Sequence, residues 1–93
     1  MREKLIEQQL VKAVKDIGGI ALKIASPGID GMPDRLILLP DRKIAFAEVK
    51  APGKALRPLQ EKRKRQLESL GFLVFCLDHI EQIGGILREI QAS

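Results

Sequence analysis

The stretch "GMPDRLILLPDRKIAFAEVK", residues 31–50, predicts a β-hairpin at the centre of the fold. "DRLILL" and "KIAFAEVK" are rich in strand-forming residues, and the segment Pro40–Arg42 between them is typical of a tight turn. If this turn is centred near Asp41, antiparallel pairing places Asp34 directly opposite Glu48. The hairpin therefore brings two acids together at its open end.

Two carboxylates at this position need a positively charged partner. Opposite residues of a sheet have Cβ atoms about 5 Å apart, which is close enough to share one cation and close enough to repel. Lys50 follows Glu48 by two residues, so both side chains project from the same face of the strand. The partner is either the ammonium group of Lys50, in a structural ion pair without chemistry, or a divalent metal ion.

The flanking sequence predicts three helices and two further strands. Apolar positions recur at helical spacing in residues 2–17, and "GIALKIA" (19–25) alternates as a strand does. Pro58 suits the start of a helix that runs to Leu70, and "FLVFCL" (72–77) is a short apolar strand, expected inside the sheet. A last helix carries a row of four apolar residues, Ile80, Ile83, Leu87 and Ile90. The expected fold is α/β, a single domain over 1–93, with the order α-β-β-β-α-β-α and a mixed four-stranded sheet flanked by helices.

Composition excludes several classes of protein. The 93 residues are 45% hydrophobic, enough for one modest core. Cys76 is the only cysteine and is expected to be a buried thiol, and the chain has one histidine, so neither a disulfide nor a Cys/His zinc site is supported. No apolar run approaches the roughly 20 residues that span a bilayer. Because "MREKLIEQQL" also lacks a signal-peptide core, we expect a soluble, cytoplasmic protein without a membrane partner.

Basic residues are concentrated after the hairpin. Seven of them lie between Lys50 and Arg65, against the single acid Glu61. This density suits a polyanion, although a charge run is also typical of a solvated helix face. A further acid, Glu7, lies at the edge of the apolar stripe of the first helix, where a carboxylate is costly unless it is paired. Two or three carboxylates and a lysine beside a polyanion-binding surface are typical of the active site of a metal-dependent phosphodiesterase.

These residues resemble the VRR-NUC domains, a branch of the PD-(D/E)xK nuclease superfamily. The resemblance rests on Glu7 in the first helix, "GMPD" ending at Asp34, "EVK" from Glu48 to Lys50, and "APGKALRPLQ" ending at Gln60. It covers nearly the whole chain and implies a restriction-endonuclease-like core of the stand-alone type found in phages and bacteria. It also implies a nuclease that acts in DNA repair or recombination.

The resemblance implies a role for each site residue. Asp34, Glu48 and the backbone carbonyl of Val49 are expected to bind Mg²⁺, for which Mn²⁺ substitutes, and Glu7 to hold a second ion or an outer-shell water. Lys50 is expected to orient the attacking water or stabilise charge rather than to act as a base, because neighbouring carboxylates favour a protonated lysine. Gln60 is expected to hydrogen-bond a water or a phosphate; without the resemblance it would be an ordinary helix-surface glutamine.

The expected substrate is DNA, held mainly by its phosphates. The candidate contacts are Lys54, Arg57, Lys62, Arg63, Lys64 and Arg65. With 3% aromatic residues and no Trp or Tyr, stacking on single strands is disfavoured, so duplex or branched duplex is expected. Alternatives are a less selective duplex or flap nuclease, an RNase, or a catalytically silent DNA-binding subunit of a repair complex.

We also expect a homodimer that resolves four-way (Holliday) junctions. Apolar residues without an obvious partner, Leu5 and the row Ile83, Leu87 and Ile90, are the expected contact surface. A two-fold dimer would match the pseudo-two-fold symmetry of a four-way junction. A helicase or another replication or repair protein is a further candidate partner.

Overall fold

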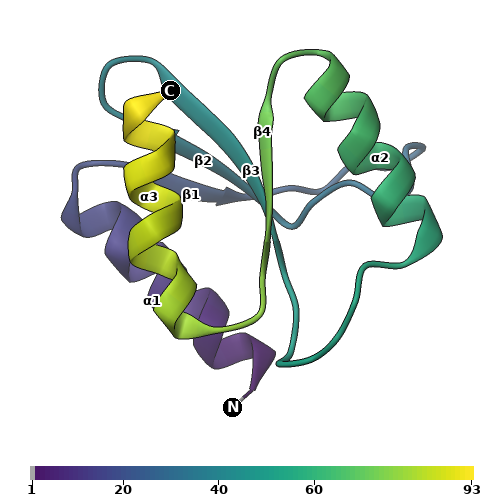
Figure 1. Ribbon diagram of the computed structural model, residues 1–93, viewed down its shortest axis with the longest axis horizontal. Coiled ribbons are helices and arrows are strands. Elements are labelled where there is room, and N and C mark those ends of the chain that lie inside the picture. Colours follow the sequence, from purple (N-terminus) through teal and green to yellow (C-terminus); the bar gives the residue numbers. More distant parts are fainter. Residues whose placement is uncertain (1) are drawn as a thin grey trace.

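The computed structural model describes residues 2–93 and has the predicted order of elements (Figure 1). The helices are α1 (Glu3–Asp16), α2 (Pro58–Ser69) and α3 (Ile83–Ala92), with a short 3₁₀ helix, η1 (Ile80–Gln82), before α3. The strands are β1 (Ile20–Lys23), β2 (Arg35–Leu39), β3 (Lys43–Val49) and β4 (Leu73–Leu77). They form one mixed sheet in the order β1-β2-β3-β4, in which only the β3–β4 pair is parallel. The predicted fold class is confirmed.

The β2–β3 hairpin has the predicted register. Leu39 pairs with Lys43 at the turn, where Asp41 and Arg42 both have positive φ, and Arg35 pairs with Ala47 at the other end. Continued by one step beyond this last pair, the register places Asp34 opposite Glu48. The turn sequence therefore fixed which two acids meet.

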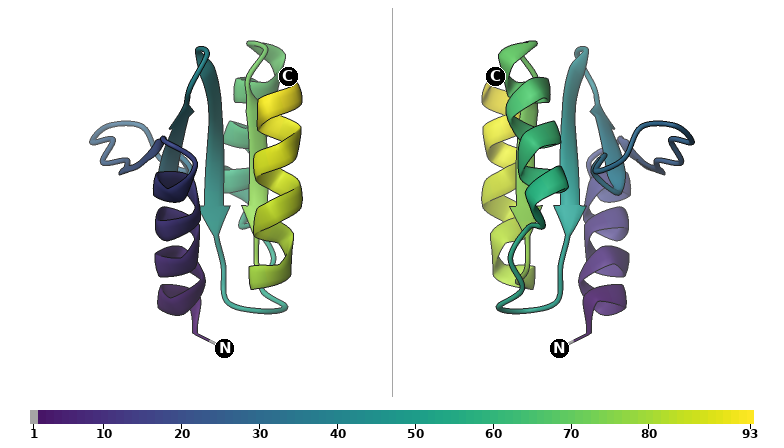
Figure 2. Two further views of the ribbon diagram at one scale, coloured as in Figure 1. Left: turned by 90° about the vertical axis from the view of Figure 1, so that its left-hand side faces the viewer. Right: turned by 90° about the vertical axis from the view of Figure 1, so that its right-hand side faces the viewer.

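Two helices cover one face of the sheet and α2 covers part of the other (Figure 2). The apolar stripe of α1, made of Ile6, Leu10 and Val14, is fully buried. It packs with α3 over the face of β3 that carries Ala45 and Ala47. Since a strand alternates its side chains, Glu48 and Lys50 project from the opposite face, toward α2.

The strand β4 lies at an edge of the sheet, so the expectation that it lies inside was wrong. Its side chains are apolar on both faces for a different reason. Both α2 and α3 contact β4, one on each face of the sheet. An edge strand sandwiched between two helices has the same composition as a central strand. Of the helices within residues 2–93, none is long and apolar enough to cross a membrane.

The apolar row of α3 is part of the core, which corrects its assignment as a contact surface. Ile83, Leu87 and Ile90 are at most 6% exposed because they pack against α1 and the sheet. Leu5 is exposed, but as a single side chain on α1.

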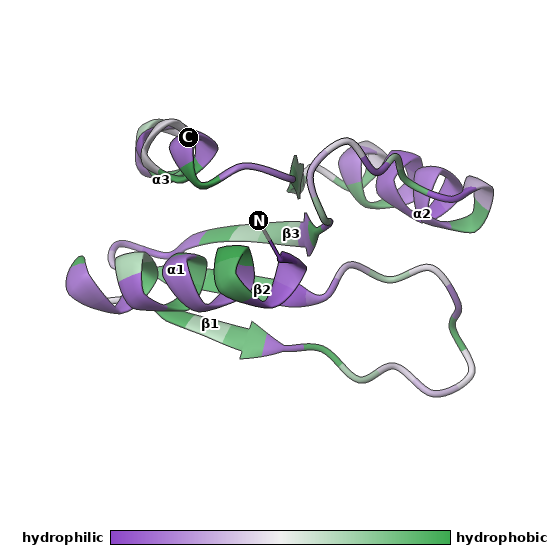
Figure 3. Cartoon of the chain, turned by 90° about the horizontal axis from the view of Figure 1, so that it is seen from below, coloured by the Kyte–Doolittle hydropathy of each residue, from purple (hydrophilic) through white to green (hydrophobic). Residues whose placement is uncertain are grey.

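A group of exposed apolar side chains lies instead on the sheet, on the same face as α2. Paired residues share a face, so the strand registers place six apolar side chains side by side there. They form two rows across β1, β2 and β3: Ile20, Leu38 and Ile44, and Leu22, Leu36 and Phe46. Ile20, Leu22 and Ile44 are 57%, 44% and 40% exposed. In Figure 3, β1 is coloured hydrophobic over most of its length, and α2 lies away from it. Helix α2 packs against β4. We call these six residues the open sheet face.

Candidate active site

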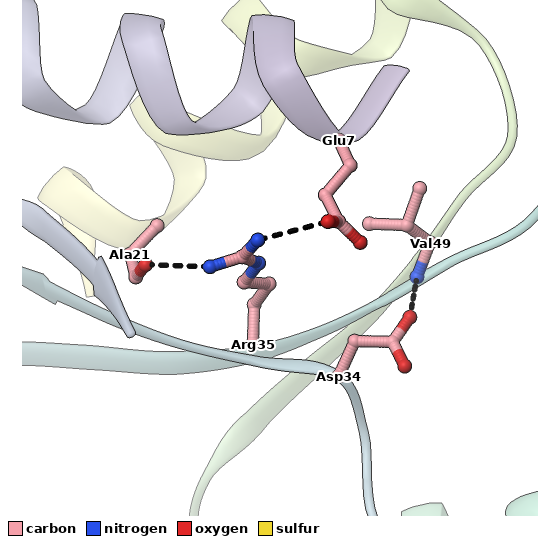
Figure 4. A network of polar contacts seen from close by, with 5 residues as sticks. All are labelled: Glu7, Ala21, Asp34, Arg35 and Val49. Atoms are coloured by element: carbon pink, nitrogen blue, oxygen red, sulfur yellow. Dashed lines mark hydrogen bonds and ion pairs between the residues drawn. The ribbon is translucent and has the colours of Figure 1, made fainter. Parts of the chain in front are cut away.

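Asp34 is fixed where the loop of residues 24–34 enters β2. Its main-chain carbonyl accepts a 2.8 Å hydrogen bond from the amide of Ile24, which closes the base of the loop. Its side-chain Oδ2 accepts a 3.0 Å hydrogen bond from the amide of Val49 (Figure 4). The carboxylate therefore lies against the end of β3, as the hairpin register requires.

Glu48 is the one buried charged residue within residues 2–93, at 6% exposure. Its Oε2 accepts a 3.0 Å hydrogen bond from Nε2 of Gln60 and lies 3.6 Å from Nζ of Lys50. Its Oε1 is buried without a hydrogen-bond partner among these residues. Burial raises the pKa of Glu48, the charge of Asp34 raises it further, and Lys50 opposes both. A carboxylate that is costly to bury and only partly satisfied is suited to a cation.

Gln60 links α2 to this acid. It is the third residue of the helix that begins at Pro58, and its Oε1 accepts a 2.8 Å hydrogen bond from the amide of Arg57. The acceptor end of the side chain thus caps the helix while the donor end holds Glu48. Gln60 is therefore not a solvent-facing glutamine.

These residues line one cavity of about 730 Å³. The loop contributes Gly31 and Met32, and α2 contributes its first turn. Two acids not singled out in the sequence, Glu3 and Asp30, also border it. Helical spacing offered a signal for Glu3, which precedes Glu7 by four residues and so shares its side of α1. Asp30 depends on the course of the loop, for which the sequence carries no periodic signal.

Glu7 lies outside this cavity and is paired with Arg35 (Figure 4). Nη2 of Arg35 lies 2.9 Å from Oε1 of Glu7, and its Nη1 donates a 3.1 Å hydrogen bond to the carbonyl of Ala21. The pair is mostly buried and joins α1, β1 and β2 next to Asp34. It supplies the partner that an acid beside the apolar stripe requires. A smaller cavity of about 430 Å³ borders the pair, together with Lys12 and Lys15.

The six basic residues expected at the DNA differ in their surroundings. Arg63 and Lys64 are half-buried and engaged within the protein: Nε of Arg63 donates to the carbonyl of Asp30 at 3.0 Å, and Lys64 pairs with Glu68 at 3.2 Å. The other four are exposed: Lys54, Arg57, Lys62 and Arg65. Arg57 also borders the cavity.

Cys76 is half-buried rather than buried, on β4 directly beside Glu48. Burial raises the pKa of its thiol, and the charge of Asp78 adds to the effect. The thiol is thereby kept in its less reactive, protonated form.

The donor set fits a hard divalent cation bound partly through water. Within residues 2–93, no group of three His, Cys, Asp or Glu side chains is arranged to hold a metal. Asp34 and Glu48 nevertheless supply two carboxylates, one with an unpartnered buried oxygen. The carbonyl of Val49 leaves the strand on the same side as its amide, which already faces Asp34. Mg²⁺ commonly binds one or two carboxylates and keeps several waters, so three protein oxygens suffice.

Comparison with known proteins supports a nuclease. No family model matches the chain. A protein of Acyrthosiphon pisum secondary endosymbiont phage 1, named "Putative nuclease p44", is 50% identical over 78 residues, which cover 84% of each chain. A solved structure described as "VRR_NUC domain" is 25% identical, with a TM-score of 0.87, over 92% of this chain and 94% of its own.

Proposed function

Because this chain belongs to the VRR-NUC family of nucleases, we propose that it is a Mg²⁺-dependent DNA endonuclease that resolves four-way junctions as a homodimer. The observation that carries the metal-dependent chemistry is the pairing of Asp34 with Glu48 in one cavity. Glu48 is buried there with one oxygen unpartnered. Without a cation, two acids this close repel and the buried one is poorly satisfied.

In this proposal Asp34, Glu48 and the carbonyl of Val49 hold the metal ion. When bound, Mg²⁺ supplies a Lewis acid and lowers the pKa of a coordinated water. Gln60 keeps Glu48 aimed into the cavity through its 3.0 Å hydrogen bond. Lys50, 3.6 Å from Glu48, places a positive charge where negative charge develops on the phosphate.

Glu7 is proposed to support the metal site indirectly rather than to bind the metal ion. Its carboxylate is engaged by Arg35, and the pair fixes the strand that begins directly after Asp34. The pair thus supports the position of the metal-binding acid from the far face of the sheet.

DNA binding is proposed to begin at the rim of the cavity. Arg57 borders the cavity, and Lys54 lies in the loop between β3 and α2. Both residues are exposed. Phosphate contacts from these residues would place the backbone over the two acids without reading sequence. Lys62 and Arg65 extend the positive surface along α2.

The open sheet face supports the dimer. The patch groups three exposed apolar side chains with three half-buried ones, and a two-fold axis lets one copy of the patch cover another. A polar partner would offer this apolar surface no apolar side chains to pack against. A second copy of the chain presents the same apolar patch at the matching position. Two active sites related by this axis would suit the two opposing strands of a junction.

One experiment tests the activity. Labelled linear, flapped and four-way-junction DNA, and a matched RNA duplex, are incubated with the protein in Mg²⁺, Mn²⁺ or EDTA. Metal-dependent cutting of the junction in preference to the linear duplex supports the proposal. Equal cutting of all DNA leaves a less selective nuclease, preferential cutting of RNA leaves an RNase, and binding without cutting leaves a silent DNA-binding subunit.

A further inference from the structure

The loop between β1 and β2, residues 24–34, lies on the same side of the sheet as α2 (Figure 3), and two contacts attach it to that helix. Nε of Arg63 donates a 3.0 Å hydrogen bond to the carbonyl of Asp30. Gly31 passes so close to α2 that a Cβ atom on it would lie 2.5 Å from the carbonyl oxygen of Leu59. Its φ of 81° is also one that other residues rarely adopt, so this position against α2 requires glycine.

The same turn of α2 reaches both acids of the cavity. Leu59 contacts the loop, and the next residue, Gln60, donates a hydrogen bond to Glu48. Asp34 follows Gly31 by three residues at the end of the same loop. The hairpin register brings the two carboxylates together, and the position of the loop against α2 then adjusts the exact spacing between them.

The guanidinium of Arg63 is held from two sides. Nη1 donates to Oε1 of Gln66 on the same helix, while Nε donates to the loop. The side chain is half-buried, unlike its exposed neighbours Lys62 and Arg65. Two of its donors, on Nε and Nη1, are thus used within the protein, in a planar fork that only arginine provides.

We infer that Arg63 is a positioning residue: together with Gly31 it holds the Asp34-bearing loop on α2 and so sets the spacing of the two carboxylates that receive the divalent cation. This assignment rests on the proposed metal-dependent function. It gives Arg63 a role other than the phosphate contact that its charge alone suggests.

Arg63→Lys separates the two roles because it keeps the charge and loses the fork. A lysine serves a phosphate almost as well as an arginine, but it cannot bond the Asp30 carbonyl and Gln66 together. Mn²⁺ affinity is measured by titration calorimetry without DNA. We expect Arg63→Lys and Arg63→Ala each to weaken it roughly tenfold, the size of effect common for residues that orient metal ligands. Arg65→Ala is expected to leave Mn²⁺ affinity unchanged.

A pair of glycine variants tests the same contact from the loop side. Gly31 and Gly28 both have positive φ, but a Cβ at Gly28 would meet nothing within 4 Å. Both alanine variants therefore strain the backbone, and only Gly31→Ala collides with α2. Only Gly31→Ala should lower Mn²⁺ affinity.

Amide hydrogen exchange of the loop supplies a readout that needs no metal. Both Arg63 variants should accelerate exchange at Ile29, whose amide donates a 3.2 Å hydrogen bond to the carbonyl of Ser26 within the loop, while the core strands keep their protection. If the wild-type chain binds no Mn²⁺, the proposed function fails. Hydrogen exchange of the loop then decides by itself whether Arg63 holds the loop on α2. If the wild-type chain binds Mn²⁺ and Arg63→Lys retains its affinity and loop protection, the positioning role is overturned.

Discussion

Nε2 of Gln60 donates a 3.0 Å hydrogen bond to Oε2 of Glu48, so the first turn of α2 is attached directly to the acid at the end of β3. The other end of the same amide accepts the Arg57 amide at 2.8 Å. One side chain thus has two separable duties, capping a helix and aiming a carboxylate. Each duty can be tested without the other.

Gln60→Ala should remove both duties, whereas Gln60→Glu should keep the cap and lose the donor. We expect the alanine variant to lose about 1 kcal/mol of unfolding free energy with the cap. The glutamate variant keeps the cap, but its carboxylate repels Glu48, so it should be destabilised at neutral pH and recover its stability at acid pH, where the pair is protonated. Both should lower the cleavage rate, roughly 10- to 100-fold for the alanine variant. Denaturant unfolding and initial cleavage rates provide the measurements. A fully active Gln60→Glu enzyme would show that the donor has no part in catalysis.

Asp34→Asn and Glu48→Gln should each abolish cleavage while DNA binding stays the same or becomes tighter. Both changes remove the carboxylate proposed to bind the metal, and both relieve its repulsion of phosphate. Product formation in Mg²⁺ and binding in EDTA are measured on the same junction. Full activity in EDTA, or in either variant, would refute the metal mechanism.

Glu48→Gln should also stabilise the metal-free protein at neutral pH. Because burial raises the pKa of Glu48 in the folded chain, the wild-type free energy of unfolding falls as pH rises through that raised pKa. The gain in the variant should therefore vanish below the ordinary glutamate value of 4.5. Thermal unfolding in EDTA across this range measures it, with the exposed acid Glu61 changed to Gln as a control. A variant less stable than wild type at neutral pH would contradict the strain assigned to Glu48.

Arg57→Ala should reduce the slope of log K for DNA against log salt by roughly 1, because it removes one phosphate contact at the rim of the cavity. Arg65 is about 140° around α2 from Gln60, so Arg65→Ala should change the slope less. Fluorescence anisotropy over a range of salt concentrations compares the two. Equal losses would place the DNA along the outer face of α2 instead of over the cavity.

Light scattering should report about twice the 10.3 kDa chain mass at micromolar concentration. Ile44→Lys places a charge in the open sheet face and should yield a folded monomer. Leu5→Lys, on a side chain of similar exposure on α1, should leave the dimer intact. A monomeric wild-type chain, or a dimer that only Leu5→Lys disrupts, would exclude the open sheet face as the interface.

Local sequence determined the elements and the hairpin register. A two-residue period, a three-residue turn and a glycine-proline loop act over a few residues, so they predict that Asp34 meets Glu48 whatever packs around them. The same reasoning places Lys50 beside Glu48, and the structure has both in one cavity with Gln60.

Tertiary packing decided which surfaces are buried and which partner each charge takes. The apolar row of α3 and the apolar residues of β1 look alike in sequence, yet the row lies in the core and Ile20 and Leu22 are exposed. Neighbouring basic residues of α2 likewise differ: Arg63 bonds the loop, Lys64 pairs with Glu68, and Lys62 and Arg65 are exposed. Whether an apolar side chain is buried depends on which other element packs against it. An ion pair such as Glu7–Arg35 likewise joins residues 28 positions apart. Neither burial nor ion pairing can be predicted from a local sequence period, because both arise only when distant segments of the chain come into contact.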